Sequence, residues 1–244
     1  MARNPLLIPA SILLGALIIG LSLIIGLSAS RSGVAGGPAG TAAAAQAVDV
    51  RDVKTEGVPY IGKEDAPVVM TYWSDYQCPY CKAFEVGGVP QINSKIPEAM
   101  PDIIKKYVET GKLKIVFKEF TFLGEDSTTA AEYAYAMWDL YPAQFYNWRV
   151  AMFEAQDDEG DEGFGDAASI DSLIKKQFPQ LDLSKIKKQI TQKKSDYAAK
   201  MEAEKQEGES FGVGGTPGFI TGTRLIGGDA PFATFAAAID PQLK

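Results

Sequence analysis

The sequence predicts an α/β domain whose sheet is interrupted by a long run of helices. Three observations lead to this class. A β-branched and aromatic run, VVMTYW (68–73), is typical of a buried strand, and a helix and a second strand follow it. A largely helical pattern then covers 127–210. Two short apolar runs and a last helical segment over 212–240 return the chain to the sheet.

An apolar segment precedes this domain. Residues 4–30 carry no charged side chain, and Leu and Ile dominate from Leu6 to Leu27. At about 1.5 Å per residue, a helix of this length crosses a hydrocarbon core of about 30 Å. We favour an uncleaved transmembrane signal-anchor over 1–30, with 5–30 in the membrane. A cleaved signal peptide ending near Ser28 and Ser30 is the alternative.

The segment after the anchor is rich in Gly and Ala. RSGVAGGPAGTAAAAQA (31–47) has no hydrophobic periodicity, which is typical of a flexible tether. We therefore predict a linker over 31–57 and the main body of the domain over 58–244. Within the linker range, we expect the folded part of the chain to begin at about Val48.

The first elements of the domain form a strand–helix–strand unit. Proline suits the first turn of a helix, so a helix is expected to start near Pro79, directly after the strand over 68–73. DIIKKYVET (102–110) predicts a helix that ends at Gly111, and LKIVFKEF (113–120) predicts the second strand.

The later elements are mostly helices. Ser127 is a candidate N-cap and Pro142 a candidate helix start, and further helices are expected over 169–178 and 184–210. PGFIT and RLI around Gly222 predict a hairpin, and PFATFAAAID (231–240) predicts the closing helix.

The composition excludes several classes of function. The formal net charge is −7 without a basic block, whereas binding to a nucleic-acid backbone needs clustered Lys and Arg. The chain contains no histidine, which excludes Ser-His-Asp and Cys-His nucleophiles and every histidine-ligated metal site. We therefore expect neither a nucleic-acid partner nor a metal.

The chain has two cysteines, and they form a Cys-x-x-Cys motif in WSDYQCPYC (73–81). A structural disulfide that closes so short a loop would restrict the unfolded chain very little. A structural zinc needs about four N or S ligands, so carboxylates or a second subunit would have to complete it. A redox dithiol has this spacing. The surrounding sequence must decide between these interpretations.

The expected helix gives the two thiols different environments. Cys78 would lie at the start of the helix, where unpaired N–H groups and the helix dipole favour a thiolate. Cys81 would lie one turn further along, more buried and within reach of Cys78. This arrangement predicts an exposed nucleophile at Cys78 and a resolving thiol at Cys81.

A second motif precedes the predicted hairpin. Proline is awkward in a strand interior, and Gly215-Thr216-Pro217 comes just before PGFIT. A cis bond between Thr216 and Pro217 would let the Thr216 backbone present its polar groups to an extended peptide beside Cys78. A trans turn proline is the alternative.

Taken together, WSDYQCPYC, VFKEFTFLG, STTAAEYAYAMW, GVGGTPGFITG and PFATFAAAID resemble the DsbA-like branch of the thioredoxin superfamily, in the right order over most of 58–241. The resemblance implies a thioredoxin fold with a helical insertion over about 123–210. It also implies an extracytoplasmic thiol–disulfide oxidoreductase, here single-pass, in which Cys78 is the nucleophile, Cys81 the resolving thiol and Thr216-Pro217 the cis-proline loop. The Cys78–Cys81 disulfide would be the redox group, without a further cofactor.

The dipeptide between the cysteines departs from the best-known oxidases of this family. They carry Pro-His, whereas this chain carries Pro79 and Tyr80. Tyr80 supplies no positive charge to the thiolate, so we expect a less strongly oxidising pair. Lys118 and Glu119, on the second strand, are candidate modulators of Cys81 or of proton transfer, but we favour a solvated charge at the strand edge as their role.

Disulfide formation in cysteine-containing client proteins is the leading hypothesis for the function. A membrane oxidase linked to quinone, of the DsbB or VKOR type, is the expected partner that reoxidises the pair. A disulfide reductase or isomerase that uses the same thiols is one alternative, and a membrane-anchored peptide-binding or chaperone module is another.

Overall fold

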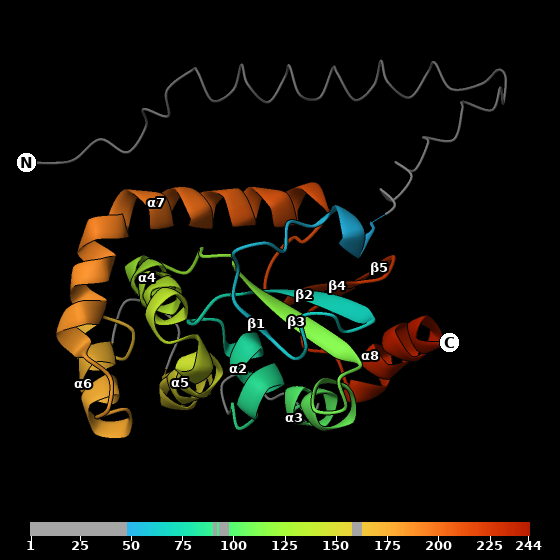
Figure 1. The fold of residues 1–244 in the computed structure, drawn as a ribbon, viewed down its shortest axis with the longest axis horizontal. Helices are drawn as coiled ribbons and strands as arrows, with labels where there is room; N and C mark the ends of the chain where they lie inside the picture. The colour runs from blue at the N-terminus through green and yellow to red at the C-terminus, as the bar shows by residue number, and fades with distance from the viewer. Residues whose placement is uncertain (1–47, 90–91, 93–97, 158–162) are drawn as a thin grey trace, which may run out of the picture. The chain divides into compact units, whose positions relative to one another are not determined.

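The structure, a computed structural model, describes residues 48–89, 92, 98–157 and 163–244. Its centre is a five-stranded sheet of order β1–β3–β2–β4–β5 (Figure 1). The strands are β1 (Tyr60–Ile61), β2 (Val68–Ser74), β3 (Leu113–Glu119), β4 (Gly218–Thr221) and β5 (Arg224–Gly227). β2 and β3 are parallel, and the other neighbouring pairs are antiparallel. The parallel pair is the strand–helix–strand unit that the sequence predicts.

Side chains of β2 alternate between the two faces of the sheet. Val68, Met70 and Tyr72 belong to the larger hydrophobic cluster, and Val69 and Trp73 belong to the smaller one. The face of the larger cluster is covered by α2 (Pro79–Val86), α3 (Met100–Ile103) and α8 (Phe232–Ile239) (Figure 1). Because both faces are covered, β2 is apolar almost throughout, as expected for a buried parallel strand.

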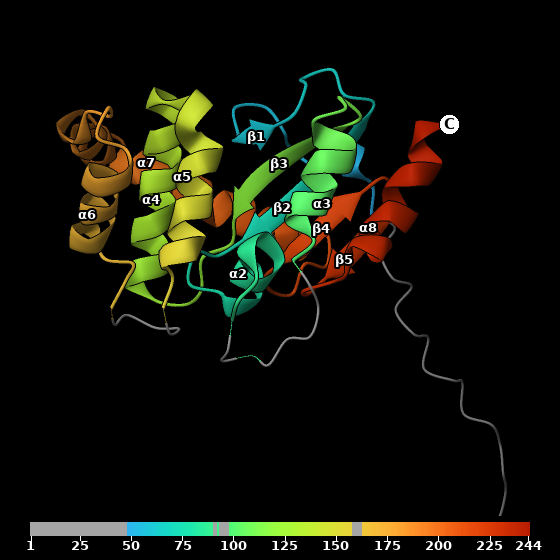
Figure 2. The same ribbon diagram turned by 90° about the horizontal axis from the view of Figure 1, so that it is seen from below.

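In the part of the chain that the structure describes, four helices lie between β3 and β4. They are α4 (Glu125–Leu140), α5 (Pro142–Ala155), α6 (Ala167–Gln177) and α7 (Leu183–Ser210). Figure 2 shows α4, α5, α6 and part of α7 gathered at one side of the sheet. The arrangement confirms the predicted fold class, a thioredoxin fold with a helical insertion.

The last turns of α7 return to the sheet and pack on Trp73. The Trp73 indole Nε1 donates a hydrogen bond to the Glu204 carbonyl at 2.9 Å. A Cβ atom at Gly208 would lie 2.9 Å from the same indole nitrogen. Glycine therefore allows the helix to approach the sheet at this position.

Two local expectations differ from the structure, and one strand was not expected. α4 begins at Glu125 after Gly124, whose φ is 106°, so Ser127 lies buried inside the helix instead of capping it. The helix expected over 102–110 begins at Met100, and its second part, Ile104–Val108, is a π-helix. β1 was not predicted, because two residues carry too little periodicity.

Residues 48–57 pack on the domain, which agrees with the expected start of the folded chain near Val48 but not with a linker that extends to residue 57. Val48, Val50 and Val53 are buried in the smaller cluster. The backbone N–H of Val50 donates to the carbonyl of Gly222 at 2.8 Å. Their apolar side chains explain the difference, because the Gly/Ala-rich composition ends before them.

The predicted membrane segment over 1–30 lies outside the described residues. Among the helices of 48–89, 98–157 and 163–244, none combines the length and the apolar character needed to cross a bilayer.

Candidate active site

The turn between β2 and α2 holds the first cysteine at the start of a helix. Cys78 is the N-cap residue of α2, and Pro79 is the first helical residue, as predicted. The Cys78 N–H donates to the Asp75 carbonyl at 3.1 Å. From the end of α5, Gln156 Nε2 donates to the Cys78 carbonyl at 3.2 Å. Contacts from both sides thus fix the backbone that carries the thiol.

A loop distant in the sequence meets the Cys78 thiol. The Thr216–Pro217 peptide bond is cis, and the Cys78 Sγ donates a hydrogen bond to the Thr216 carbonyl at 3.3 Å. The pKa of Cys78 lies below its ordinary value, chiefly because Cys81 donates a side-chain hydrogen bond, with further help from the N–H groups of Cys81 and Tyr80. These donors favour the thiolate at a helix start.

The second cysteine has the opposite environment. Cys81 is 0% exposed and Cys78 is 3% exposed, and neither is in a disulfide. Burial, with the neighbouring Cys78, raises the pKa of Cys81 well above its ordinary value. Cys78 is therefore the thiol that ionises readily, but it is nearly buried, in contrast to the exposed nucleophile expected from the sequence. The Thr216 carbonyl lies over its sulfur and accounts for part of this difference.

The surface beside the two thiols is rich in glycine. Tyr80 is 48% exposed. A groove of about 420 Å³ runs beside the cis-proline loop, and Gly212–Gly218, Leu225, Gly227 and Gly228 line it. Its outer wall belongs to β5, the last strand of the sheet order, and Leu225 there is exposed. An extended peptide fits such a surface, because edge-strand backbone groups are free to pair.

The two candidate modulators on β3 lie against α7. Lys118 forms an ion pair with Glu207 at 2.5 Å. The Glu119 N–H donates to Glu204 Oε2 at 2.8 Å. Burial raises the pKa of Glu119 to about 8. Both side chains are buried, so the role that we favoured for them, a solvated charge at the strand edge, is wrong. Influence of either residue on Cys81 stays a prediction.

A buried ion pair, which was not predicted, supports α2, the helix that carries the two cysteines. Arg149 on α5 pairs with Glu85 on α2 at 2.8 Å, and both side chains are fully enclosed. The guanidinium also donates to Ser74 Oγ at 3.0 Å. It lies over four aromatic rings, those of Tyr72, Tyr76, Phe117 and Phe153. The insertion therefore supplies a positive charge beneath α2.

Tyr72 and Gln156 were also not predicted as residues of the site. Gln156 donates to two carbonyls of the turn, those of Tyr76 (2.6 Å) and Cys78 (3.2 Å). A polar residue directly after an apolar helix ordinarily indicates a solvated end, so its sequence carried no signal. Tyr72 counted only as an apolar residue of a strand.

The helix start, the asymmetric thiols and the adjoining loop together define a class of protein. A thiol that forms a thiolate beside a buried partner at Cys-x-x-Cys spacing performs thiol–disulfide exchange. The fold and the site thus define a thiol–disulfide oxidoreductase with a thioredoxin fold.

Comparisons with known proteins agree with this class. A family profile described as Thioredoxin matches residues 54–241. Disulfide bond formation protein D of Bacillus subtilis is 27% identical over 194 residues, which cover 78% of each chain. A probable disulfide bond formation protein D of Bacillus cereus is 25% identical over 184 residues, which cover 75% of this chain and 78% of the relative.

Solved structures show the same fold. The crystal structure of oxidised BdbD from Bacillus subtilis has a TM-score of 0.66 at 24% identity and covers 78% of this chain and 95% of that one. The thiol–disulfide exchange protein alpha-DsbA2 from Wolbachia pipientis has a TM-score of 0.61 at 23% identity and covers 75% and 86%. The chain belongs to the thioredoxin family, and it is a thiol–disulfide oxidoreductase.

Proposed function

We propose that this enzyme forms disulfide bonds in cysteine-containing client proteins outside the cytoplasm. The observation that carries the proposal is the opposite shift of the two thiol pKa values, downward for Cys78 and upward for Cys81. A stabilised Cys78 thiolate stabilises the reduced protein. This makes the Cys78–Cys81 disulfide a stronger oxidant, because the oxidised form gives up its disulfide more readily.

The reaction uses the two sulfurs in sequence. A client thiolate attacks the Cys78 sulfur of the Cys78–Cys81 disulfide. A bond between the client and Cys78 forms, the bond between the two cysteines breaks, and its electron pair leaves on Cys81. A second client thiolate then attacks the client sulfur of the mixed disulfide and releases Cys78 as a thiolate. The client leaves with one new disulfide and the enzyme keeps two electrons.

Client binding is assigned to the surface beside Cys78. The groove over Gly212–Gly218 and the edge strand β5 would hold an extended segment. The Thr216 carbonyl accepts a hydrogen bond from the Cys78 thiol in the reduced enzyme. It becomes available to a peptide N–H once Cys78 forms a disulfide with the client. Contacts to backbone make this surface tolerant of different client sequences.

Two observations bear on the direction of electron flow. The names of the Bacillus relatives denote disulfide bond formation, which supports the oxidising direction. Tyr80, between the cysteines, is a neutral side chain that adds no positive charge beside Cys78. The strongest oxidases of the fold have a reduction potential of about −120 mV. We therefore expect a lower, less oxidising reduction potential for this dithiol.

The equilibrium potential of the dithiol decides between oxidase and reductase. The oxidised domain is equilibrated with glutathione buffers, and the fraction of free Cys78 and Cys81 is measured by alkylation and mass spectrometry. The proposal expects a value above about −200 mV and transfer of the disulfide to reduced, denatured ribonuclease. A value near that of thioredoxin, about −270 mV, with no transfer, would favour a reductase.

Residues 5–30 are proposed to anchor the enzyme in the membrane, with the domain on the extracytoplasmic side. Support comes from the uncharged apolar run of that segment. When the full chain is expressed, it should remain in the membrane fraction after a carbonate wash. Protease added outside intact cells should digest its folded domain. The chain without 1–47 should be soluble. Release of the full chain by carbonate would overturn the anchor.

Reoxidation of the reduced pair is assigned to a membrane oxidase linked to quinone. Such an enzyme passes the two electrons of Cys78 and Cys81 to quinone, which becomes quinol, and the pair returns to a disulfide. Membranes of a host that contains such an oxidase should reoxidise the reduced domain only when a soluble quinone is present. Reoxidation that is independent of quinone would contradict this partner.

A further inference from the structure

Tyr72 carries a buried hydroxyl that forms no structural hydrogen bond within the described residues. The residue lies on β2 and is 0% exposed. Its ring is stacked on Phe219 with a centroid distance of 4.5 Å and contacts Phe84 edge-on at 5.3 Å. Within the described part of the chain, no group forms a hydrogen bond of acceptable geometry with its hydroxyl oxygen. Buried polar groups of proteins nearly always have a partner, and leaving one unpaired costs stability.

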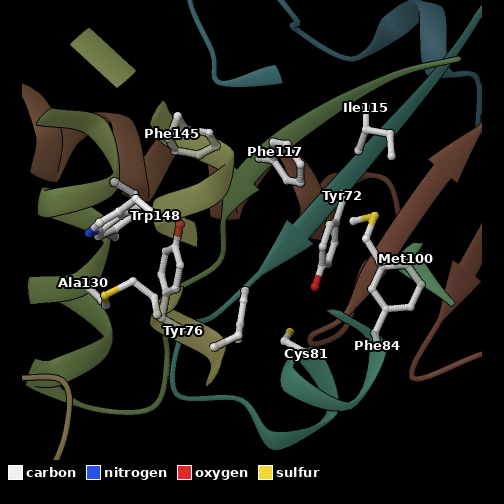
Figure 3. Packing of buried hydrophobic residues seen from close by; sticks show 14 of the residues in the cluster. Tyr72, Tyr76, Cys81, Phe84, Met100, Ile115, Phe117, Ala130, Phe145 and Trp148 are labelled. Carbon is white, nitrogen blue, oxygen red and sulfur yellow. The ribbon is translucent and has the colours of Figure 1, made fainter. Parts of the chain in front are cut away.

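The group that the hydroxyl faces is the resolving thiol. Figure 3 shows the Tyr72 hydroxyl pointing from β2 toward Cys81 on α2, with the Cys81 sulfur pointing back. After burial, the charge of Cys81 is the largest influence that raises the pKa of Tyr72. The two groups therefore interact, and hydrogen bonding to Cys81 contributes to the same rise, although the geometry around the neutral thiol is not yet that of a formed hydrogen bond.

The ring of Tyr72 is held so that this direction is fixed. The Arg149 guanidinium carbon lies 4.9 Å from the ring centroid, and its ion pair with Glu85 keeps it there. Phe219 stacks on the ring and Phe84 closes its edge. Because these neighbours hold the ring, the hydroxyl is preorganised toward the sulfur before any charge develops on it.

Cys81 needs a hydrogen-bond donor at one step of the exchange reaction. When a client thiolate attacks Cys78, the electron pair of the Cys78–Cys81 bond leaves on the Cys81 sulfur. That sulfur is fully enclosed, so water cannot solvate the new thiolate. A neutral phenol aimed at it is the kind of donor that stabilises a developing anion.

We propose that Tyr72 is a further catalytic residue of the redox reaction, whose hydroxyl donates a hydrogen bond to the Cys81 sulfur as it leaves the disulfide as a thiolate. Hydrogen bonds to a charged partner are shorter and stronger than neutral ones. The bond therefore strengthens as the reaction proceeds, which lowers the barrier more than it stabilises the resting enzyme. The inference rests on the exchange reaction proposed above.

The first test measures the leaving step alone. Oxidised enzyme is mixed with excess glutathione, quenched with an alkylating agent, and the single adduct at Cys78 is counted by mass spectrometry. Tyr72→Phe should form it about 10- to 100-fold more slowly. The control Tyr135→Phe removes another buried phenol hydroxyl, which donates a hydrogen bond to Glu204 Oε2 at 2.8 Å. Its rate should match the wild type. Equal rates for Tyr72→Phe and the wild type would overturn the proposal.

The second test reads the thiolate directly and needs no client. The chain has two cysteines, so a Cys78→Ser protein grown with cysteine labelled at ¹³Cβ gives one resonance, that of Cys81. Adding Tyr72→Phe should raise the midpoint of its pH titration by about 1 unit or more, which corresponds to 1.36 kcal/mol per unit. An unchanged midpoint would contradict the proposal. A shift without any transfer to clients would keep it and reject the proposed function.

A third measurement guards against a variant that fails to fold. In the wild-type protein, tyrosine labelled at ¹³Cζ reports the hydrogen bonding of Tyr72 as the pH is raised through the Cys81 titration. The proposal expects the Tyr72 signal to move with Cys81. A signal that stays constant while Cys81 ionises would overturn it.

Discussion

The Thr216 carbonyl oxygen lies 3.3 Å from the Cys78 sulfur, although the two residues are 138 positions apart in the sequence. The contact joins the start of α2 to the loop before β4. It places the thiol and the groove over Gly212–Gly218 in one site. The fold therefore places the Cys78 sulfur next to the surface that we propose for clients.

The reactivity of the two thiols should differ strongly with pH. In the reduced domain, alkylation of Cys78 by iodoacetamide should have its midpoint below the ordinary value of 9.0, because hydrogen bonds favour its thiolate. Cys81 should react far more slowly, because burial raises its pKa. Mass spectrometry after timed quenching reads both sites. Equal rates at Cys78 and Cys81 would contradict the assigned roles.

The same shift sets the pH dependence of the reduced form. A folded thiol pKa below the unfolded one adds stability that is full above the unfolded value and is lost as pH falls through the folded value. Cys78 should therefore stabilise the reduced protein at pH 9 relative to pH 5. Denaturant unfolding of the reduced wild type and of reduced Cys78→Ser gives the difference. A contribution that grows as pH falls would contradict the Cys78 shift.

Breaking the buried ion pair should cost much more than breaking an exposed one. Arg149→Met leaves the Glu85 carboxylate enclosed without its partner, so the free energy of unfolding should fall by about 3–5 kcal/mol. Adding Glu85→Gln should restore part of it. The control is Lys193→Ala, which breaks an exposed pair with Asp196 and should change stability by less than about 1 kcal/mol. Similar losses for both pairs would contradict this account.

Glu119→Gln should stabilise the domain in alkaline solution. The folded pKa of Glu119 is about 8 because of burial. The group therefore adds stability at low pH that is lost as pH rises from about 4.5 to about 8. Glutamine carries no charge, so above pH 8 the variant should be more stable by about 1–3 kcal/mol, with a flatter pH curve. Urea unfolding at several pH values measures the free energy of unfolding of both proteins. The exposed Glu64→Gln variant serves as control, and equal curves for both would contradict the shift.

Gly208→Ala should destabilise the contact between α7 and the sheet. Alanine usually favours a helix over glycine by about 1 kcal/mol. Here its Cβ would lie 2.9 Å from the Trp73 indole nitrogen. We expect a net loss of about 1–3 kcal/mol in the free energy of unfolding, with a change in Trp fluorescence. Gly214→Ala, where a Cβ meets open space, is the control. A stabilised Gly208→Ala protein would contradict the packing.

Much of the fold could be predicted from the sequence. The strand over 68–73 combined β-branched residues with a proline just beyond it, and it lies where it was expected, with α2 starting at Pro79. Pro142 begins α5 and Gly222 lies in the hairpin, also as expected. These signals are local, because each fixes the backbone of its own few residues.

The parts that the sequence did not predict depend on contacts across the fold. Arg149 is one basic residue within an aromatic helix, and only the packing of α5 on α2 makes it a partner of Glu85. In the sequence, Tyr72 is only one more apolar residue of a buried strand, and its role depends on the position of Cys81. Ser127 has cap chemistry, yet Gly124 lets the helix start earlier. Long-range pairing of this kind leaves no periodic pattern in a single sequence.

Trapping of clients tests the central claim most directly. The full chain with Cys81→Ser lacks the resolving thiol, so client proteins should remain attached to Cys78 as mixed disulfides in an oxidising compartment. These adducts should appear on non-reducing gels, vanish with a reductant, and be absent from Cys78→Ser. If Cys81→Ser forms no adducts while the folded domain is present, this protein does not exchange disulfides with clients through Cys78.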